Sequence, residues 1–181
     1  PSRQHRFMTA LTPAKLKAIR LLAFDYDGVF TDGTILIDSD GKMLRQGHAK
    51  DGFAIQWAMK QGLPIAIVSG GKEPSVEERM RGLGVKEVHL GSHDKMAVLR
   101  DLAARTGIGL EEMAYMGDDM PDIPALQAVG LSCCPQDAAT DVLTVCDHVS
   151  DLPGGKGCVR ELIEAHMKAN GIWQGEGLVN W

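Results

Sequence analysis

Short apolar segments that end at polar loops, with helix-like segments between them, are the feature that most constrains the fold of this chain. Leu21–Phe24 is entirely apolar and stops at Asp25. Residues 64–68 are also apolar and stop at Ser69. Apolar runs this short are typical of strands buried on both faces of a sheet. Since helical segments separate them, the chain predicts right-handed βαβ crossovers and a mostly parallel sheet.

The expected elements define a three-layer, Rossmann-like α/β fold with helices on both faces of a central sheet. The predicted strands cover residues 21–24, 64–68, 87–90, 112–116 and 130–133. A short leading helix is predicted after Thr12, because apolar residues recur at helical spacing from there to Leu22. Further helices are predicted at 51–61, 74–84, 95–104 and 159–168. In such a sheet, ligands bind beyond the carboxyl ends of the strands.

Residues 34–47 predict a β-hairpin outside the main sheet. Ile35 and Ile37 lie in one short run, and a second run resumes at Met43. Asp40 and Gly41 stand between the two runs, and an Asp-Gly pair in that position is a strong hairpin signal. We expect this hairpin to protrude from the domain.

The length and charge of the chain limit its partners. Its 181 residues predict one domain over 1–181, with a core at about 18–170 and a loose tail at about 171–181. The net charge is -5, which gives no general attraction to nucleic acid. Any anionic ligand must therefore be held locally, by a metal, by a few cations or by backbone N–H groups.

Compartment signals favour a cytoplasmic protein. No apolar run approaches the ~18–20 residues that a membrane span needs, and residues 1–11 lack the apolar centre of a secretory signal. The cysteines contain no C-x-x-C pair, and we interpret them as structural or incidental in a reducing compartment. They lie in the last third of the chain: Cys133, Cys134, Cys146 and Cys158.

Acidic residues gather at two of the predicted strand ends. Asp25 and Asp27 follow the first strand, and Asp118, Asp119 and Asp122 follow a later one. Carboxylates crowded together are unfavourable unless a cation lies among them or one is protonated. Oxygen ligands favour a hard divalent ion, and Mg²⁺ suits a site that also receives phosphate. A simple turn with solvated acids is the alternative interpretation of the first pair.

Two further segments are suited to holding an oxyanion. Ser69 and Gly70, after the second strand, offer a hydroxyl and a closely approachable backbone N–H. Lys95 begins a predicted helix and offers a cation. Taken singly, the first segment is also typical of a tight turn and the lysine of an exposed surface.

Together these segments resemble the haloacid dehalogenase-like phosphatases from about Leu21 to Leu162. The order of the residues carries the resemblance: Asp25 and Asp27, Ser69, Lys95, then Asp118, Asp119 and Asp122. It implies that Asp25 is the nucleophile of an aspartyl-phosphate mechanism and that Asp27 is the general acid and base. It further implies Mg²⁺ bound by Asp25, Asp27 and Asp118, a phosphate cradle of Ser69, Gly70 and Lys95, and an outer role for Asp119 and Asp122.

The spacing of these motifs leaves no room for a cap domain, which would need ~50 residues or more. The hairpin and one helix already fill the interval from Asp27 to Ser69, and two helices and a strand fill the interval from Ser69 to Asp118. The site is therefore either open to large substrates or closed by another subunit, and we favour the second arrangement.

Two segments resemble a capless branch of that superfamily, the 3-deoxy-D-manno-octulosonate 8-phosphate phosphatases. They are residues 47–55 and residues 154–161. The branch implies a homotetramer in which neighbouring hairpins and tails roof each site, and a product used for lipopolysaccharide. It also implies sugar contacts from His48, Ala49, Lys50, Asp51, Gly52, Gln56, Lys72 and Arg79. Some relatives have arginine near the positions of Lys50 and Lys72, and lysine lacks its bidentate fork.

Three other functions were compared with this one. A phosphatase for a nine-carbon 2-keto-3-deoxy sugar acid would share every motif and differ in residues 48–56 and at Lys72. A non-catalytic scaffold is disfavoured because each expected catalytic residue is present. A nucleotide-binding module is excluded because the first strand is followed by D-x-D-G instead of G-x-G-x-x-G.

Overall fold

A computed structural model describes residues 11–175 of the chain. Its helices are α1 (Pro13–Ala18), α2 (Ala49–Lys60), α3 (Pro74–Gly82), α4 (Lys95–Thr106), α5 (Ile123–Ala128), α6 (Thr140–Leu143) and α7 (Cys158–Ala169). Its strands are β1 (Leu21–Phe24), β2 (Leu36–Ile37), β3 (Met43–Leu44), β4 (Ile65–Val68), β5 (Glu87–His89), β6 (Met113–Met116), β7 (Leu131–Cys134) and β8 (His148–Val149). Short 3₁₀ turns, η1 (Leu110–Glu112) and η2 (Met120–Asp122), precede β6 and α5.

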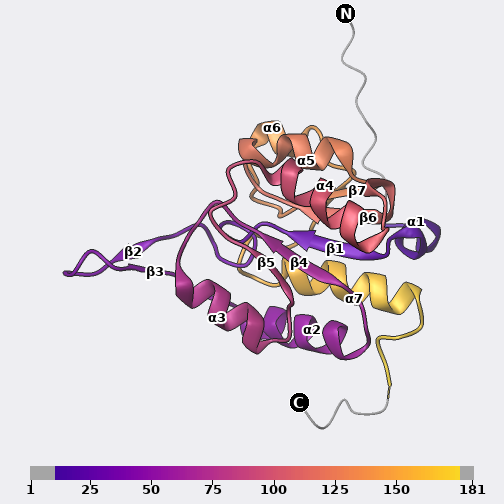
Figure 1. Cartoon of the computed structure of the whole chain (residues 1–181), viewed down its shortest axis with the longest axis horizontal. Coiled ribbons are helices and arrows are strands. Elements are labelled where there is room, and N and C mark those ends of the chain that lie inside the picture. Colours follow the sequence, from indigo (N-terminus) through magenta and orange to yellow (C-terminus); the bar gives the residue numbers. More distant parts are fainter. Residues whose placement is uncertain (1–10, 176–181) are drawn as a thin grey trace, which may run out of the picture.

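The main sheet has the strand order β5-β4-β1-β6-β7-β8, and each neighbouring pair is parallel. The helices form a layer on each face (Figure 1). One apolar cluster joins the sheet to α1, α2, α3 and α7, and a second joins it to α4, α5 and α6. The predicted three-layer α/β fold with a mostly parallel sheet is confirmed.

The central strand β1 contributes to both clusters because successive side chains of a strand point to opposite faces. Leu22 and Phe24 lie in the cluster with α2 and α7, whereas Leu21 and Ala23 lie in the cluster with α4 and α5. All four side chains are buried. This two-sided burial fixes the register of β1 and hence the position of the loop that follows it.

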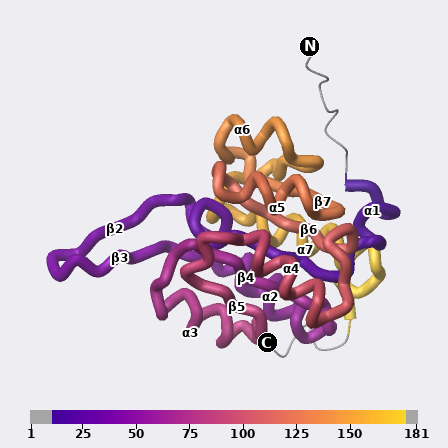
Figure 2. The backbone as a smooth tube through the Cα atoms, turned by 45° about the horizontal axis from the view of Figure 1, so that its top comes forward, coloured from indigo at the N-terminus to yellow at the C-terminus, as the bar shows by residue number. Residues whose placement is uncertain are grey.

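The predicted hairpin is confirmed as a separate two-stranded sheet that projects away from the domain (Figures 1 and 2). Leu36 pairs with Leu44 in antiparallel register. The Asp38 carboxylate closes the turn by accepting hydrogen bonds from two backbone N–H groups, those of Asp40 at 3.0 Å and Lys42 at 2.8 Å. Gly41 supplies the positive φ of 78° that this turn needs.

Three short elements were not predicted. The strand β8 has two half-buried residues, too few for an alternating pattern, and it extends the expected five-stranded sheet to six. The helices α5 and α6 have six and four residues, which is too short for a clear helical period. In addition, α1 ends at Ala18, because Ile19 is extended and Leu22 belongs to β1. The helix α2 begins at Ala49, two residues before the predicted start.

The end of the chain is packed further than predicted. Ile172 and Trp173 contact the apolar cluster of α2 and α7. Trp57 Nε1 donates a hydrogen bond to the Trp173 carbonyl at 2.9 Å. Part of the predicted loose tail is therefore packed on the domain. Residues 176–181 lie outside the described residues, as do residues 1–10.

The cysteines belong to the interior of the domain. All four cysteine side chains are buried and none forms a disulfide. Among residues 11–175, no helix has the length and apolar character required to cross a membrane.

Candidate active site

An acidic pocket lies at the carboxyl edge of the sheet, where β1, β4 and β6 end side by side. Asp25 follows β1 directly, Ser69 follows β4 directly, and Asp118 follows β6 after one glycine. The pocket has a volume of about 470 Å³. Eight predicted site residues line it: Asp25, Asp27, Ser69, Gly70, Lys95, Asp118, Asp119 and Asp122. The rest of the lining comes from Gly28, Gly33, Gly71, Ser92, His93 and Pro121.

Lys95 connects two of the buried carboxylates. Its Nζ lies 3.0 Å from Oδ1 of Asp25 and 2.5 Å from Oδ1 of Asp122. The side chain is only 7% exposed. Burial alone would lower the pKa of Lys95, but the two carboxylates outweigh it and raise the pKa, so the ammonium stays charged. Lys95 is the first residue of α4, so the beginning of this helix places the lysine backbone beside the pocket.

The Asp122 carboxylate accepts four hydrogen bonds that hold the loop after β6. Its Oδ1 accepts hydrogen bonds from Lys95 and from the Tyr115 hydroxyl at 2.6 Å. Its Oδ2 accepts the backbone N–H groups of Asp118 and Asp119, at 3.0 and 3.2 Å. Both oxygens of Asp122 thus already accept hydrogen bonds from the protein.

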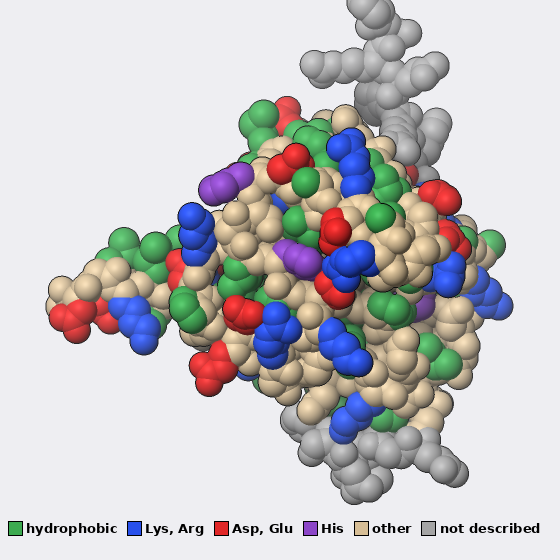
Figure 3. Space-filling model, in the orientation of Figure 1, with side chains coloured by type: hydrophobic (Ala, Val, Ile, Leu, Met, Phe, Trp, Pro, Cys, Tyr) green, Lys and Arg blue, Asp and Glu red, His purple; other side chains and the backbone are tan. Residues whose placement is uncertain are grey.

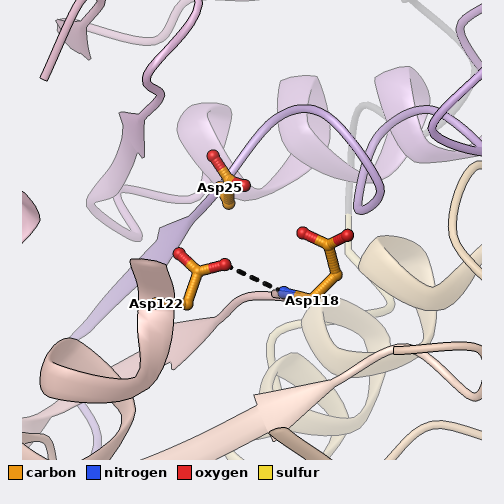
Figure 4. Close-up of side chains that lie close together, drawn as sticks. All are labelled: Asp25, Asp118 and Asp122. Carbon is orange, nitrogen blue, oxygen red and sulfur yellow. Dashed lines mark hydrogen bonds between the residues drawn. The ribbon is translucent and has the colours of Figure 1, made fainter. Parts of the chain in front are cut away.

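Asp25, Asp118 and Asp122 converge from the β1 end and from the two ends of the β6 loop (Figure 4). One carboxylate oxygen from each lies within 4.8 Å of the others. Burial and the neighbouring Asp122 raise the pKa of Asp25 to about 6. Burial and the neighbouring Asp25 raise the pKa of Asp118 to about 7. Lys95 offsets only one of the three carboxylate charges, so the cluster has both the oxygen donors and the excess negative charge that suit a hard divalent cation.

Gly28 permits the close approach of the β1 loop to the Asp118 side chain. Its φ is +79°, a conformation that favours glycine. A β-carbon at this position would overlap the Asp118 carboxylate. The D-x-D-G pattern therefore includes its glycine because the acid of the neighbouring strand occupies the space where a side chain would lie.

Asp27 is held by a residue that the sequence analysis did not identify. Arg45 Nε lies 2.6 Å from Oδ1 of Asp27, and its Nη2 lies 3.1 Å from Oδ2. The same guanidinium lies 3.3 Å from Glu73. Arg45 follows β3 directly, so the hairpin delivers it to the pocket. A basic residue at the foot of a predicted hairpin was the available signal.

The loop after β4 forms a compact turn beside these acids. The Gly71 N–H donates to Ser69 Oγ at 3.1 Å. Ser69 itself is buried, whereas Gly70 is exposed in the pocket lining. Asp119 turns towards solvent and caps η2, where its carboxylate accepts the Met120 N–H at 2.8 Å. The structure therefore brings Ser69 and Gly70 together with the acids and leaves the Asp119 side chain at the rim.

The predicted sugar contacts are only partly near this pocket. Lys72 is exposed, and its chain lies against Gly91, next to the loop of Ser92 and His93. Arg79 lines a neighbouring hollow beneath the hairpin, together with Tyr26 and Arg45. Neither Lys72 nor Arg79 is among the residues that line the acidic pocket.

The remaining predicted sugar contacts lie at the start of α2 or along it, and none of them lines the acidic pocket. His48 and Lys50 line a separate hollow against α7. Asp51 is buried and accepts the Arg160 N–H at 2.8 Å, so its role here is to join α2 to α7. Ala49 lines the hollow beneath the hairpin together with Arg79, and Gly52 lies against the Arg79 guanidinium. Gln56 lines a hollow at the opposite edge of the sheet, among the amino ends of the strands.

Comparison with known proteins places the chain in a family. Residues 85–162 match the model of the haloacid dehalogenase-like hydrolases. The chain is 36% identical over 158 residues to the 3-deoxy-D-manno-octulosonate 8-phosphate phosphatase of Escherichia coli strain K12, which covers 87% of this chain and 84% of that protein.

Solved structures agree with this assignment. A phosphatase of the same name from Yersinia pestis superposes with a TM-score of 0.88 at 31% identity, over 92% of this chain and 90% of that one. The Moraxella catarrhalis phosphatase, solved with magnesium, phosphate and KDO, gives 0.85 at 32% identity, over 89% and 92%. The chain therefore belongs to the haloacid dehalogenase-like hydrolases, in the family of the 3-deoxy-D-manno-octulosonate 8-phosphate phosphatases.

Proposed function

We propose that this protein is a Mg²⁺-dependent phosphomonoesterase that hydrolyses 3-deoxy-D-manno-octulosonate 8-phosphate to the sugar acid and phosphate. The observation that carries the proposal is the buried Asp25 carboxylate at a strand end, 3.0 Å from Lys95 and clustered with Asp118. A nucleophile, a fixed cation and a metal-type acid cluster thus share one pocket. The substrate of the family relatives supports the choice of sugar acid phosphate.

In the first half of the proposed reaction, an Asp25 carboxylate oxygen attacks the phosphorus atom. The bond between phosphorus and the ester oxygen breaks, and its electron pair stays on that oxygen. Asp27 gives its proton to the leaving oxygen, so the sugar acid departs as a neutral alcohol at that position. The product on the protein is an aspartyl-phosphate at Asp25.

In the second half, water attacks the phosphorus atom of the aspartyl-phosphate. Asp27, now a carboxylate, takes one proton from that water. The bond between phosphorus and the Asp25 oxygen breaks, which restores the Asp25 carboxylate and releases inorganic phosphate. Asp27 ends protonated and the cycle is closed.

The phosphate cradle in this proposal consists of Ser69, the Gly70 N–H and Lys95. Lys95 supplies a preorganised positive charge because its contacts with Asp25 and Asp122 hold it in place. Ser69 lies on the loop that follows β4, whose turn is fixed by the Gly71 N–H. These donors would face the charge that develops on the transferring group.

The residues present fit a divalent ion. Asp25 and Asp118 would hold Mg²⁺ with the Asp27 carbonyl, because hard oxygen donors at neighbouring strand ends suit that ion. When bound, it screens the carboxylates from the phosphate and stabilises charge on the transferring group. Asp122 and Asp119 would act from outside the ligand set, with Asp122 holding the loop by its hydrogen bonds.

The roof of the pocket is proposed to come from other copies of the chain in a homotetramer. Among residues 11–175, most of the large exposed apolar side chains are on the hairpin (Figure 3): Ile35, Leu36, Ile37, Met43 and Leu44. A protruding apolar arm of this kind marks a protein–protein contact. Lys72 and Arg79, exposed cations outside the pocket lining, are the candidates for the sugar carboxylate. His48, Lys50 and their neighbours would contribute across a subunit contact.

The proposed function also implies a cytoplasmic enzyme that supplies the sugar acid for lipopolysaccharide. It needs no nucleic acid or membrane partner. A phosphatase for a nine-carbon 2-keto-3-deoxy sugar acid phosphate is the second candidate, because the same acids and cations would serve it.

Phosphate release from a panel of sugar acid phosphates, with Mg²⁺ and with a chelator, tests the function. We expect the eight-carbon ester to have the highest kcat/KM, and activity to vanish in the chelator and in Asp25→Asn. Faster hydrolysis of the nine-carbon ester would select the second candidate. Absence of activity towards every ester would instead favour a non-catalytic subunit.

A further inference from the structure

We propose that Arg45, at the foot of the hairpin, is a positioning residue that fixes the orientation of Asp27, the proposed proton donor. The inference rests on the phosphatase function proposed above. The hairpin would then support catalysis in its own subunit, in addition to any contact that it makes with another subunit.

The contact between the two side chains is bidentate. Arg45 Nε lies 2.6 Å from Oδ1 of Asp27, and Nη2 lies 3.1 Å from Oδ2. A guanidinium that donates to both oxygens fixes the plane of the carboxylate as well as its position. The Arg45 side chain is 8% exposed and that of Asp27 is 34% exposed. The arginine is therefore the anchored partner, and the acid is the one that reaches solvent and substrate.

A second carboxylate keeps the guanidinium in place. Glu73, on the loop before α3, lies 3.3 Å from Arg45 Nη1. The other Glu73 oxygen accepts the Lys72 N–H at 3.1 Å. Arg45 is thus held between the β1 loop and the β4 loop, and Asp27 cannot turn away without breaking two hydrogen bonds.

The position at which Asp27 is held is close to the phosphate cradle. A β-carbon on Gly71 would lie 3.4 Å from Oδ2 of Asp27 and 3.4 Å from Ser69 Oγ. The Asp27 carboxylate and the Ser69 hydroxyl of the cradle therefore both lie close to Gly71. Arg45 itself lines the adjoining hollow under the hairpin and is absent from the lining of the acidic pocket.

This arrangement separates the effect of Arg45 from that of the cradle. Loss of Arg45 would misplace the proton donor and leave Asp25, Ser69 and Lys95 in place. Esters with a poor leaving group need a proton on the departing oxygen, whereas a nitrophenolate departs without one. The loss should therefore grow as the leaving group becomes more basic.

A series of aryl phosphates of similar shape, from phenyl to 4-nitrophenyl phosphate, tests this at saturating Mg²⁺. The measured quantity is kcat/KM, which ends at release of the phenol and so excludes the later attack of water. For Arg45→Met, we expect kcat/KM for phenyl phosphate to fall by about tenfold or more, up to the ~10²–10⁴ that general acid catalysis contributes. For 4-nitrophenyl phosphate, the same variant should lose less than about threefold.

Three further variants complete the test. Arg45→Lys keeps the charge without the fork and should recover part of the loss. In an Asp27→Asn background, Arg45→Met should cause no additional loss. Arg105→Met is the matched control, because Arg105 makes a similar two-oxygen contact with Glu87, away from the acidic pocket. It should leave the whole series unchanged.

An equal loss for every ester, no loss for any, or a further loss in the Asp27→Asn background would overturn the proposal. The activity of the variants towards 4-nitrophenyl phosphate reports that they fold. A wild-type protein that is inactive towards all phosphates would contradict the proposed function itself, and the inference with it. A wild-type enzyme whose Arg45→Met variant shows no dependence on the leaving group contradicts the inference alone.

Discussion

The Lys95 ammonium lies 3.0 Å from the Asp25 carboxylate, and neither side chain is more than 11% exposed. The ammonium compensates a charge that burial disfavours, and it also contacts Asp122. One side chain therefore links the stability of the domain to the readiness of the proposed nucleophile.

Replacement of Lys95 by methionine should abolish phosphate release and destabilise the fold. Removing one partner of a buried ion pair costs roughly 3–5 kcal/mol, because the carboxylates are left uncompensated. Thermal unfolding at neutral pH in a chelator, together with the phosphate assay, measures both effects. Lys168→Met is the control, since Lys168 makes an exposed pair with Glu164 and should change stability by less than about 1 kcal/mol. A stable, active Lys95→Met variant would contradict the prediction.

Replacement of Gly28 by alanine should weaken Mg²⁺ binding at least about tenfold, the equivalent of 1.4 kcal/mol. The new β-carbon would overlap the Asp118 carboxylate and displace it from Asp25. Gly41→Ala is a matched control, because Gly41 has nearly the same φ, +78°, with no atom within 4 Å of a new β-carbon. Titration of Mg²⁺ against thermal stability measures the affinity. Equal weakening in both variants would attribute the effect to backbone strain instead of to Asp118.

The sequence predicted the centre of this site and not its surroundings, for a physical reason. The carboxyl ends of parallel strands lie at the same edge of a sheet, so Asp25, Ser69 and Asp118 could be brought together from three distant segments. The Arg45 contact depends on the direction in which the hairpin leaves the domain, which no local pattern encodes. The resemblance places Asp51 among the sugar contacts, and in this structure its buried carboxylate accepts the Arg160 N–H at the start of α7.

The short elements at the second half of the sheet were missed for a similar reason. The two residues of β8 are positioned by parallel pairing with β7, such as that of Cys134 with Val149. That pairing is a tertiary contact, and it overrides the weak local preference of a two-residue segment.

Stabilisation of the protein by Mg²⁺ should increase with pH. The pKa values of Asp25 and Asp118 are raised to about 6 and about 7 in the folded protein, against ~3.9 for an unfolded aspartate. The folded state therefore binds more protons between about pH 4 and 7, and this pair lowers the stability of the metal-free protein as the pH rises through that window. Mg²⁺ needs both carboxylates ionised, so it competes with protons below pH 7.

At a fixed Mg²⁺ concentration, the rise in Tm should therefore be larger at pH 8 than at pH 6. Differential scanning fluorimetry with Mg²⁺ and with a chelator measures it. The Asp118→Asn variant is the control and should lose most of this pH dependence. An equal rise at both pH values in the wild-type protein would show that metal binding is not coupled to these carboxyls.

Charge on the hairpin should disperse the proposed oligomer and leave the domain folded. Leu36 and Ile37 are 64% and 65% exposed, and the hairpin is a separate two-stranded sheet, so Leu36→Asp together with Ile37→Asp removes no core contact. If these side chains are covered by other subunits, burying two carboxylates there is unfavourable and the mass measured by light scattering should fall towards that of one chain. Met120→Asp is the matched control, because Met120 is 60% exposed and lies off the hairpin. Its mass should equal that of the wild type.

A wild-type protein that is monomeric and fully active would contradict the shared roof, whereas an unchanged mass in the hairpin variant would place the subunit contact elsewhere. Dispersal with loss of sugar phosphate turnover but retained 4-nitrophenyl phosphate turnover would assign the roof to substrate recognition, because the chemistry at Asp25 would then be intact in the single chain.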